Sequence, residues 1–122
     1  MNDNYLPDIF KMFIGGYMGD SYFVEWNENV LLYRKNEEEI EIKPDKQMWS
    51  KFWEEVNEIN IWEWDRKYKP EERIVDGTSW KINIKYNDKE IVSSGSNAYP
   101  SNSEFTRFCD AVSELVGKRE FK

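Results

Sequence analysis

A short loop near the end of the sequence carries the side chains best suited to binding chemistry. The segment Gly95-Ser96-Asn97-Ala98-Tyr99-Pro100 follows a predicted strand and precedes a helix that we expect to begin at Ser101. Amides at a helix N-terminus lack helical partners and favour an anion. Ser96, Asn97 and Ser101 add polar groups, and Tyr99 can stack on a ring. The loop therefore predicts either a site for a small anionic ligand or a rigid connector, and the connector is favoured.

Four further candidates lie on a predicted strand. Strict alternation over residues 60–68 places Trp62, Trp64, Arg66 and Tyr68 on one strand face. Such a face can act as an aromatic platform for a ring or a sugar. Aromatic strands in a small protein also supply the core, and this second interpretation is favoured here.

Acidic residues are concentrated between positions 37 and 65. Glu54 and Glu58 lie on the outward side of a predicted helix, and Glu37–Glu41 precede that helix. This set forms either a negative surface that meets a basic protein partner or an ordinary solvated face. The ligand order of a calcium-binding EF-hand is absent, so we expect no metal site.

Composition excludes several classes of chemistry. The 122 residues include no histidine, one cysteine, 17 basic and 24 acidic side chains, for a formal charge of −7. No Ser-His-Asp triad or Cys-His pair can form, and no recognisable catalytic constellation replaces them. Cys109 falls on an apolar helical stripe and is expected to be a buried, inert thiol. We therefore expect no enzyme and no cofactor, and the acidic charge argues against direct nucleic-acid binding.

The sequence also predicts a soluble location. There is no run of eighteen apolar residues, and the first residues lack a basic signal-peptide region. A membrane association is therefore not expected, and the lone thiol agrees with a cytoplasmic setting.

Hydrophobic periodicity predicts an α+β fold in a single domain, residues 1–122. Apolar residues recur at helical spacing in two segments, where Asp45 and a Ser101–Glu104 capping box would begin the helices and Gly117 would end the second. The predicted strands cover residues 21–26, 30–34, 40–42, 60–68 and a hairpin over 79–95. We expect an antiparallel sheet of about five to six strands with both helices on one face. Residues 1–20 are expected to be an irregular arm or an edge strand.

A series of short motifs runs through most of the chain. It comprises Trp49…Phe52-Trp53, Trp62-Glu63-Trp64, Asp76-Gly77-Thr78-Ser79-Trp80 and the Gly95–Pro100 segment. This series resembles a group of small bacterial proteins that share the pattern W-x-x-F-W, W-x-W, D-G-T-x-W and G-S-N-A-Y-P over residues 22–117. The resemblance implies a bacterial source and an ordered fold, and it transfers no catalytic residue.

Two functions from different classes follow. The first is a non-catalytic acidic binding protein, such as a small cytoplasmic inhibitor or immunity-type protein for a basic protein partner. The alternative is a protein that binds or sequesters a nucleotide- or sugar-like ligand through the Gly95–Ser101 loop and nearby aromatics.

Overall fold

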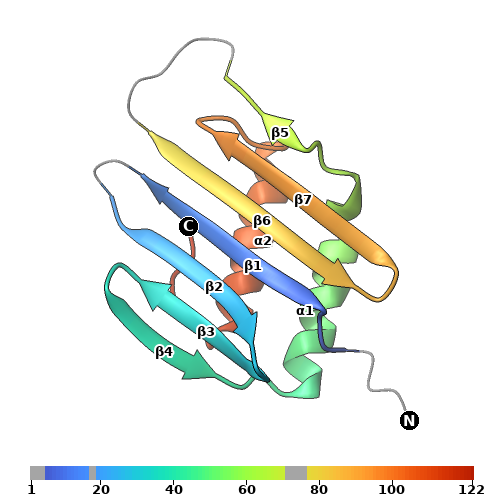
Figure 1. Cartoon of the computed structure of the whole chain (residues 1–122). Helices are drawn as coiled ribbons and strands as arrows, with labels where there is room; N and C mark the ends of the chain where they lie inside the picture. The colour runs from blue at the N-terminus through green and yellow to red at the C-terminus, as the bar shows by residue number, and fades with distance from the viewer. Residues whose placement is uncertain (1–4, 17–18, 71–76) are drawn as a thin grey trace.

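The apolar faces of the strands and helices pack together in two layers, a sheet and a pair of helices (Figure 1). The computed structural model describes residues 5–16, 19–70 and 77–122. Asp76 of the Asp76–Trp80 motif lies outside the described residues, as do residues 1–4, 17 and 18 of the N-terminal segment.

Seven strands of the described chain form one sheet with the order β4-β3-β2-β1-β6-β7-β5. All neighbouring strands are antiparallel except β5 and β7. The α+β class and the largely antiparallel sheet are confirmed, with slightly more strands than expected. The elements are β1 (Ile9–Gly16), β2 (Ser21–Asn27), β3 (Val30–Lys35), β4 (Glu38–Ile42), α1 (Lys46–Glu58), the short 3-10 helix η1 (Ile61–Glu63), β5 (Lys67–Tyr68), β6 (Thr78–Tyr86), β7 (Lys89–Ser96) and α2 (Asn102–Leu115).

Residues 9–16 form neither an irregular arm nor an edge strand, so that expectation is wrong for them. Strand β1 lies in the middle of the sheet and pairs with β2 on one side and β6 on the other. Phe10, Met12 and Ile14 alternate with more exposed residues and point into the core. The sequence obscures this pattern because Phe13, on the opposite face, is also apolar.

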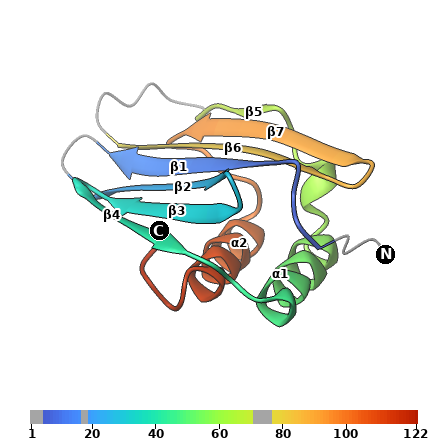
Figure 2. The same cartoon turned by 60° about the horizontal axis from the view of Figure 1, so that its bottom comes forward.

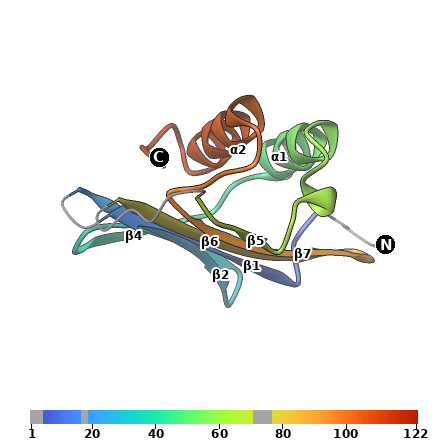
Figure 3. The ribbon, with the colours of Figure 1, turned by 90° about the horizontal axis from the view of Figure 1, so that it is seen from above.

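Both helices cover the same face of the sheet, as Figures 2 and 3 show. Phe10 on β1 meets the rings of Trp49 and Phe52 on α1 edge-on, each at 5.3 Å between centroids. Trp53 stacks on Tyr86 of β6 at 3.8 Å. These rings are large and mostly buried, so aromatic side chains supply much of the contact between α1 and the sheet.

The helix ends follow local sequence signals at two of the expected positions. The Asp45 carboxylate accepts a hydrogen bond from the Met48 amide at 2.8 Å and caps α1, as predicted. Gly117 follows α2 with φ +77°, a conformation that glycine adopts without a Cβ clash, and this stop is also confirmed.

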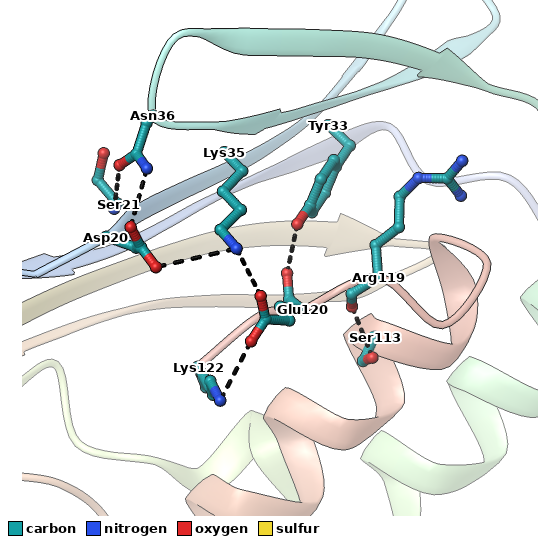
Figure 4. A network of polar contacts seen from close by, with 9 residues as sticks. All are labelled: Asp20, Ser21, Tyr33, Lys35, Asn36, Ser113, Arg119, Glu120 and Lys122. Carbon is teal, nitrogen blue, oxygen red and sulfur yellow. Dashed lines mark hydrogen bonds and ion pairs between the residues drawn. The ribbon is translucent and has the colours of Figure 1, made fainter.

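A polar clasp binds the C-terminal segment to strand β3 (Figure 4). The Tyr33 hydroxyl donates to the Glu120 carbonyl at 2.6 Å, and the Lys35 ammonium lies 2.5 Å from the Glu120 carboxylate. Phe121, which is buried, contacts the rings of Tyr22 and Phe108. The clasp therefore fastens the chain after α2 to the sheet.

The clasp predicts a pH-dependent stability difference for Glu120→Gln. The hydrogen bond from Lys35, and then that from Lys122, hold the pKa of Glu120 below its ordinary value. A carboxylate with a lowered folded pKa stabilises the fold above its unfolded pKa, and this stabilisation is lost as pH falls through the folded pKa. We expect a small loss of stability near neutral pH, because the pair is exposed.

Urea unfolding across pH measures this difference. The Glu63→Gln variant is the control, since it removes the same charge at an exposed position outside the clasp. The difference between the Glu120→Gln variant and wild type should vanish in acid. A difference that persists unchanged below the Glu120 pKa would contradict the role given to the ion pair.

Candidate functional site

The predicted ligand loop is held by the start of strand β6. The Asn97 side-chain oxygen accepts from the Thr78 amide at 3.0 Å, and the Asn97 amide donates to the Thr78 carbonyl at 2.8 Å. Asn97 has φ +55°, a left-handed conformation that asparagine tolerates better than most residues. A Cβ at Gly77 would lie 1.6 Å from the Asn97 side-chain oxygen. The two motifs that contain Gly77 and Asn97 therefore form one interlocked unit.

Trp80 extends this unit into the core. Its indole N–H donates to the Ala98 carbonyl at 2.8 Å. Gly95 lies under this contact, since a Cβ there would be 2.3 Å from the Ala98 oxygen and 2.5 Å from the Trp80 indole nitrogen. Close approach of the chain to a buried tryptophan explains the glycine, so no ligand phosphate is needed to account for it.

Tyr99 uses its ring within the same unit. It lies nearly parallel to Trp80 at 6.4 Å and contacts Phe105 at 4.8 Å. Ser96 and Ser101 remain exposed. The structure thus places Asn97 and Tyr99 in structural contacts and leaves the two serines at the surface.

The capping box predicted for α2 is wrong. The Ser101 side chain makes no capping hydrogen bond, although Ser101 does occupy the N-cap position. The Glu104 carboxylate instead accepts from the Trp64 indole N–H at 2.9 Å. Trp64, which is distant in the sequence, thus binds the carboxylate that the capping box would need for the Ser101 amide. The spacing of Ser101 and Glu104 alone gives no sign of this alternative partner.

The predicted aromatic platform is also wrong, because most of residues 60–68 do not form a strand. Asn60 adopts a left-handed conformation with φ +57°, and η1 follows directly. Trp62 is partly exposed and donates to Asn57 at 2.6 Å, whereas Trp64 is buried against Trp80 and Phe108.

Arg66 and Tyr68 lie at the end of this segment. The Arg66 side chain is exposed, and its carbonyl accepts from the Ser94 amide at 3.1 Å. The Tyr68 hydroxyl accepts from the Asp65 amide at 2.9 Å, and its ring contacts Trp80. The favoured core interpretation therefore holds for Trp64, and the four side chains do not share a face.

A hollow lies beside Tyr99, between α2 and the C-terminal segment. Its volume is about 600 Å³, and Tyr99, Phe105 and Phe121 contribute its aromatic walls. Thr78 and Lys122 add polar groups. Of the predicted loop residues only Tyr99 lines it. Sequence reasoning missed Phe121, because the tail gave no sign that it folds back on the helix.

A second hollow separates the outer sides of α1 and α2. It measures about 770 Å³ and has an apolar floor that includes Phe52 and Leu115. Arg107 bridges the helices, since its guanidinium binds Glu55 and lies 3.2 Å from Glu58. Glu54 and Glu58 are the two acidic residues of α1 that were predicted to contact a partner. Glu58 forms an ion pair with Arg107, and Glu54 is exposed.

A row of acidic side chains lies on the edge strand β4. Glu38, Glu39 and Glu41 are exposed, and β4 pairs only with β3 in the described sheet. Arg34 on β3 forms an ion pair with Glu39 at 2.8 Å. The sequence predicted a strand over residues 40–42, which includes Glu41, and the structure begins that strand two residues earlier, at Glu38.

The described residues offer little reactive chemistry. Cys109 is buried, as expected, and this burial, and to a lesser extent Asp110, raises the pKa of its thiol to about 12, which disfavours the reactive thiolate. Within the described ranges there is no group of three or more residues that could hold a metal ion. No helix among them is both long and apolar enough to cross a bilayer.

No protein-family model matches this chain, and a comparison with curated proteins finds no significant match.

The interlocked loop predicts that Asn97→Ala destabilises the protein by about 1–3 kcal/mol. The Thr78 amide loses its acceptor, and alanine disfavours the left-handed backbone. Chemical unfolding measures the change. Asn97→Asp keeps an acceptor and should retain most of the stability, while the exposed Ser96→Ala should change it by less than about 0.5 kcal/mol. Equal unfolding midpoints for wild type and Asn97→Ala would disprove the structural role.

Proposed function

We propose that this chain is a non-catalytic binding protein that recognises a basic protein partner through the edge strand β4. The observation that carries the proposal is the row of exposed carboxylates on a strand whose outer edge has no neighbour in the described sheet. An unpaired edge offers backbone donors and acceptors to an extended segment of another chain. The carboxylates select a segment that carries lysine or arginine.

The side chains of β4 are arranged for recognition on both faces of an added strand. Glu38 lies opposite Lys35 of β3, on the face of the sheet that the helices cover. Glu41 lies opposite Leu32 of β3, on the open face of the sheet. A basic strand added beside β4 would therefore meet carboxylates above and below its own plane. Acidic edges also prevent self-association of sheets. The same charge that repels like edges would attract a basic one.

A role as an inhibitor or immunity-type protein fits this chemistry. The net charge of −7 steers association toward a positively charged surface and raises the association rate. Such a partner would have a basic site, as enzymes that act on polyanions do. The proposal includes a cytoplasmic setting, with which the single free thiol agrees.

A matched pair of triple variants tests the edge. The probe is an extended peptide of alternating lysine and valine, and its dissociation constant is measured by calorimetry at two salt concentrations. Neutralising Glu38, Glu39 and Glu41 with glutamine should weaken binding by about tenfold or more. Neutralising Glu54, Glu58 and Glu63 changes the net charge equally but leaves β4 intact, so binding should stay within about twofold.

Amide hydrogen exchange adds a structural readout, since strand addition should protect amides of β4. Equal weakening by both triple variants, or unchanged exchange in β4 upon peptide binding, would refute the edge as the binding surface.

A second candidate function is favoured by the hollow beside Tyr99. We propose that a small ring-bearing ligand with an anionic group binds there, with Tyr99, Phe105 and Phe121 around the ring and Lys122 near the anion. The aromatic walls support this alternative. The ligand's anion would compete for Lys122 with Glu120, which lines the hollow together with Asp110. The hydrogen-bonding groups of Asn97, in contrast, are engaged with Thr78.

Thermal-shift screening with nucleoside monophosphates, aromatic carboxylates and phenyl glycosides tests this candidate. A ligand at a hundred times its dissociation constant stabilises the fold by about 2.7 kcal/mol. Thr106→Trp should fill the hollow and abolish the shift, whereas Ser96→Ala should preserve it because Ser96 does not line the hollow. No shift across the panel, or a shift that survives the Thr106→Trp substitution, would remove the candidate.

A further inference from the structure

The sheet has an open face, opposite the two helices, that no described element covers (Figures 2 and 3). Apolar side chains lie near its centre, on either side of Lys11. Ile9 and Phe13 on β1 are each 38% exposed, and Val92 on β7 is 36% exposed. Exposed faces of antiparallel sheets are usually polar, and clustered apolar side chains at the surface indicate an interaction site.

The charges on the open face follow an ordered pattern on either side of β1. Moving outward in one direction, β2, β3 and β4 present negative, positive and negative side chains. Moving outward in the other direction, β6, β7 and β5 present positive, negative and positive ones. The residues are Glu25, Arg34, and Glu39 with Glu41 on the first side, and Lys81 with Lys85, Glu90, and Lys67 on the second.

This pattern is complementary to itself. A twofold axis that runs along β1, in the plane between two facing copies, brings β2 of one copy opposite β6 of the other. It likewise brings β3 opposite β7 and β4 opposite β5. In the register of the sheet, Glu39 of one copy then lies opposite Lys67 of the other, and Glu25 lies opposite Asn83, between Lys81 and Lys85. Arg34 lies opposite Ser94, farther along β7 than Glu90. Twofold interfaces use the same patch on both subunits, which requires such self-complementarity.

We propose that the open face is the interface of a symmetric dimer, in which a second copy of this chain packs sheet against sheet. The apolar side chains match in the same arrangement. Phe13 lies on the axis and meets its counterpart, while Leu32 on β3 lies opposite Val92 on β7. Two sheets that pack face to face with nearly aligned strands form a common type of core.

The register of the sheet adds one specific contact. Phe23 and Lys81 flank Phe13 on opposite sides in the same row, so Phe23 of one copy lies opposite Lys81 of the other. The Phe23 ring already accepts cations, since the Lys11 ammonium and the Arg34 guanidinium lie 5.9 and 5.4 Å from its centroid. Lys11 itself lies on the axis and opposes its own counterpart, and its cross-strand neighbour Glu25 supplies the compensating charge.

The dimensions of the face set the strength of the dimer. Strands about 4.8 Å apart and about 20 Å long give the five central strands an area of roughly 500 Å² per copy. Two copies then bury roughly 1,000 Å², which is the lower end of specific interfaces. A reversible, concentration-dependent and salt-sensitive dimer is therefore expected. A single-stranded nucleic acid suits the face less well, because Glu25, Glu39, Glu41 and Glu90 would repel its phosphates.

Complementary charge reversal tests the proposal on the whole chain. Sedimentation of wild type should show a monomer–dimer equilibrium. Glu25→Lys alone and the double variant K81E/K85E alone should each weaken the dimer by about tenfold or more, since like charges then face each other. An equimolar mixture of the two variants restores opposite charges at both symmetry-related contacts. It should return the dissociation constant to within about threefold of wild type.

Controls separate the interface from net charge and folding. Lys51→Glu and Glu114→Lys, at the hollow between the helices, should leave the dimer unchanged. Phe13→Cys should be joined to its counterpart by a short bismaleimide, whereas Ser50→Cys on α1 should not.

Three outcomes would overturn the proposal: a monomer at all concentrations in low salt, a mixture that remains monomeric although both variants fold, or crosslinking through Ser50→Cys but not Phe13→Cys. Binding of single-stranded oligonucleotide that competes with dimerisation and is lost in K81E/K85E would assign the face to nucleic acid instead, and would also overturn it.

Discussion

Strand β1 hydrogen-bonds to β2 along one edge and to β6 along the other, and the rest of the sheet depends on this double pairing. Residues 21–42 form one antiparallel meander, and residues 78–96 form a separate hairpin. Only β1 joins them in the described sheet. Phe10, Met12 and Ile14 on β1 also form the centre of the surface that α1 and α2 cover. Without β1, neither half would offer the helices a sheet wide enough to bury both.

The position of β1 determines which surfaces remain for recognition. Because β1 is central, the acidic strand β4 becomes an edge, and the charged side chains of the outer strands lie on both sides of Ile9 and Phe13 on the open face. The polar groups of the loop near Gly95, in contrast, are used in structural hydrogen bonds. Asn97 accepts from the Thr78 amide, and the Ala98 carbonyl accepts from the Trp80 indole N–H. The recognition surfaces that we propose therefore lie on the sheet, at its edge and on its open face, and not at the loop where polar residues cluster in the sequence.

Local signals in the sequence were sufficient for much of the fold. The stripes of the two helices, the cap at Asp45, the stop at Gly117 and the strands 79–95 each depend on residues close together in the chain, so their patterns can be read directly. The failures involve partners far apart in sequence. The Glu104 carboxylate, which was expected to cap α2, instead accepts from Trp64, forty positions away in the sequence. Asn60 adopts a left-handed backbone conformation at a position where the alternation predicted a strand. The same holds for β1, whose place in the sheet depends on two distant strands.

Native-state amide hydrogen exchange tests the central place of β1 most directly. Amides of a strand paired on both sides exchange only through large-scale unfolding, whereas those of an arm or an edge exchange through local opening. The amides of Met12 and Phe13 should therefore exchange as slowly as those of Ile82 and Ile84 on β6, with protection close to the global stability. Fast exchange in β1, at rates like those of the edge strand β4, would contradict the account.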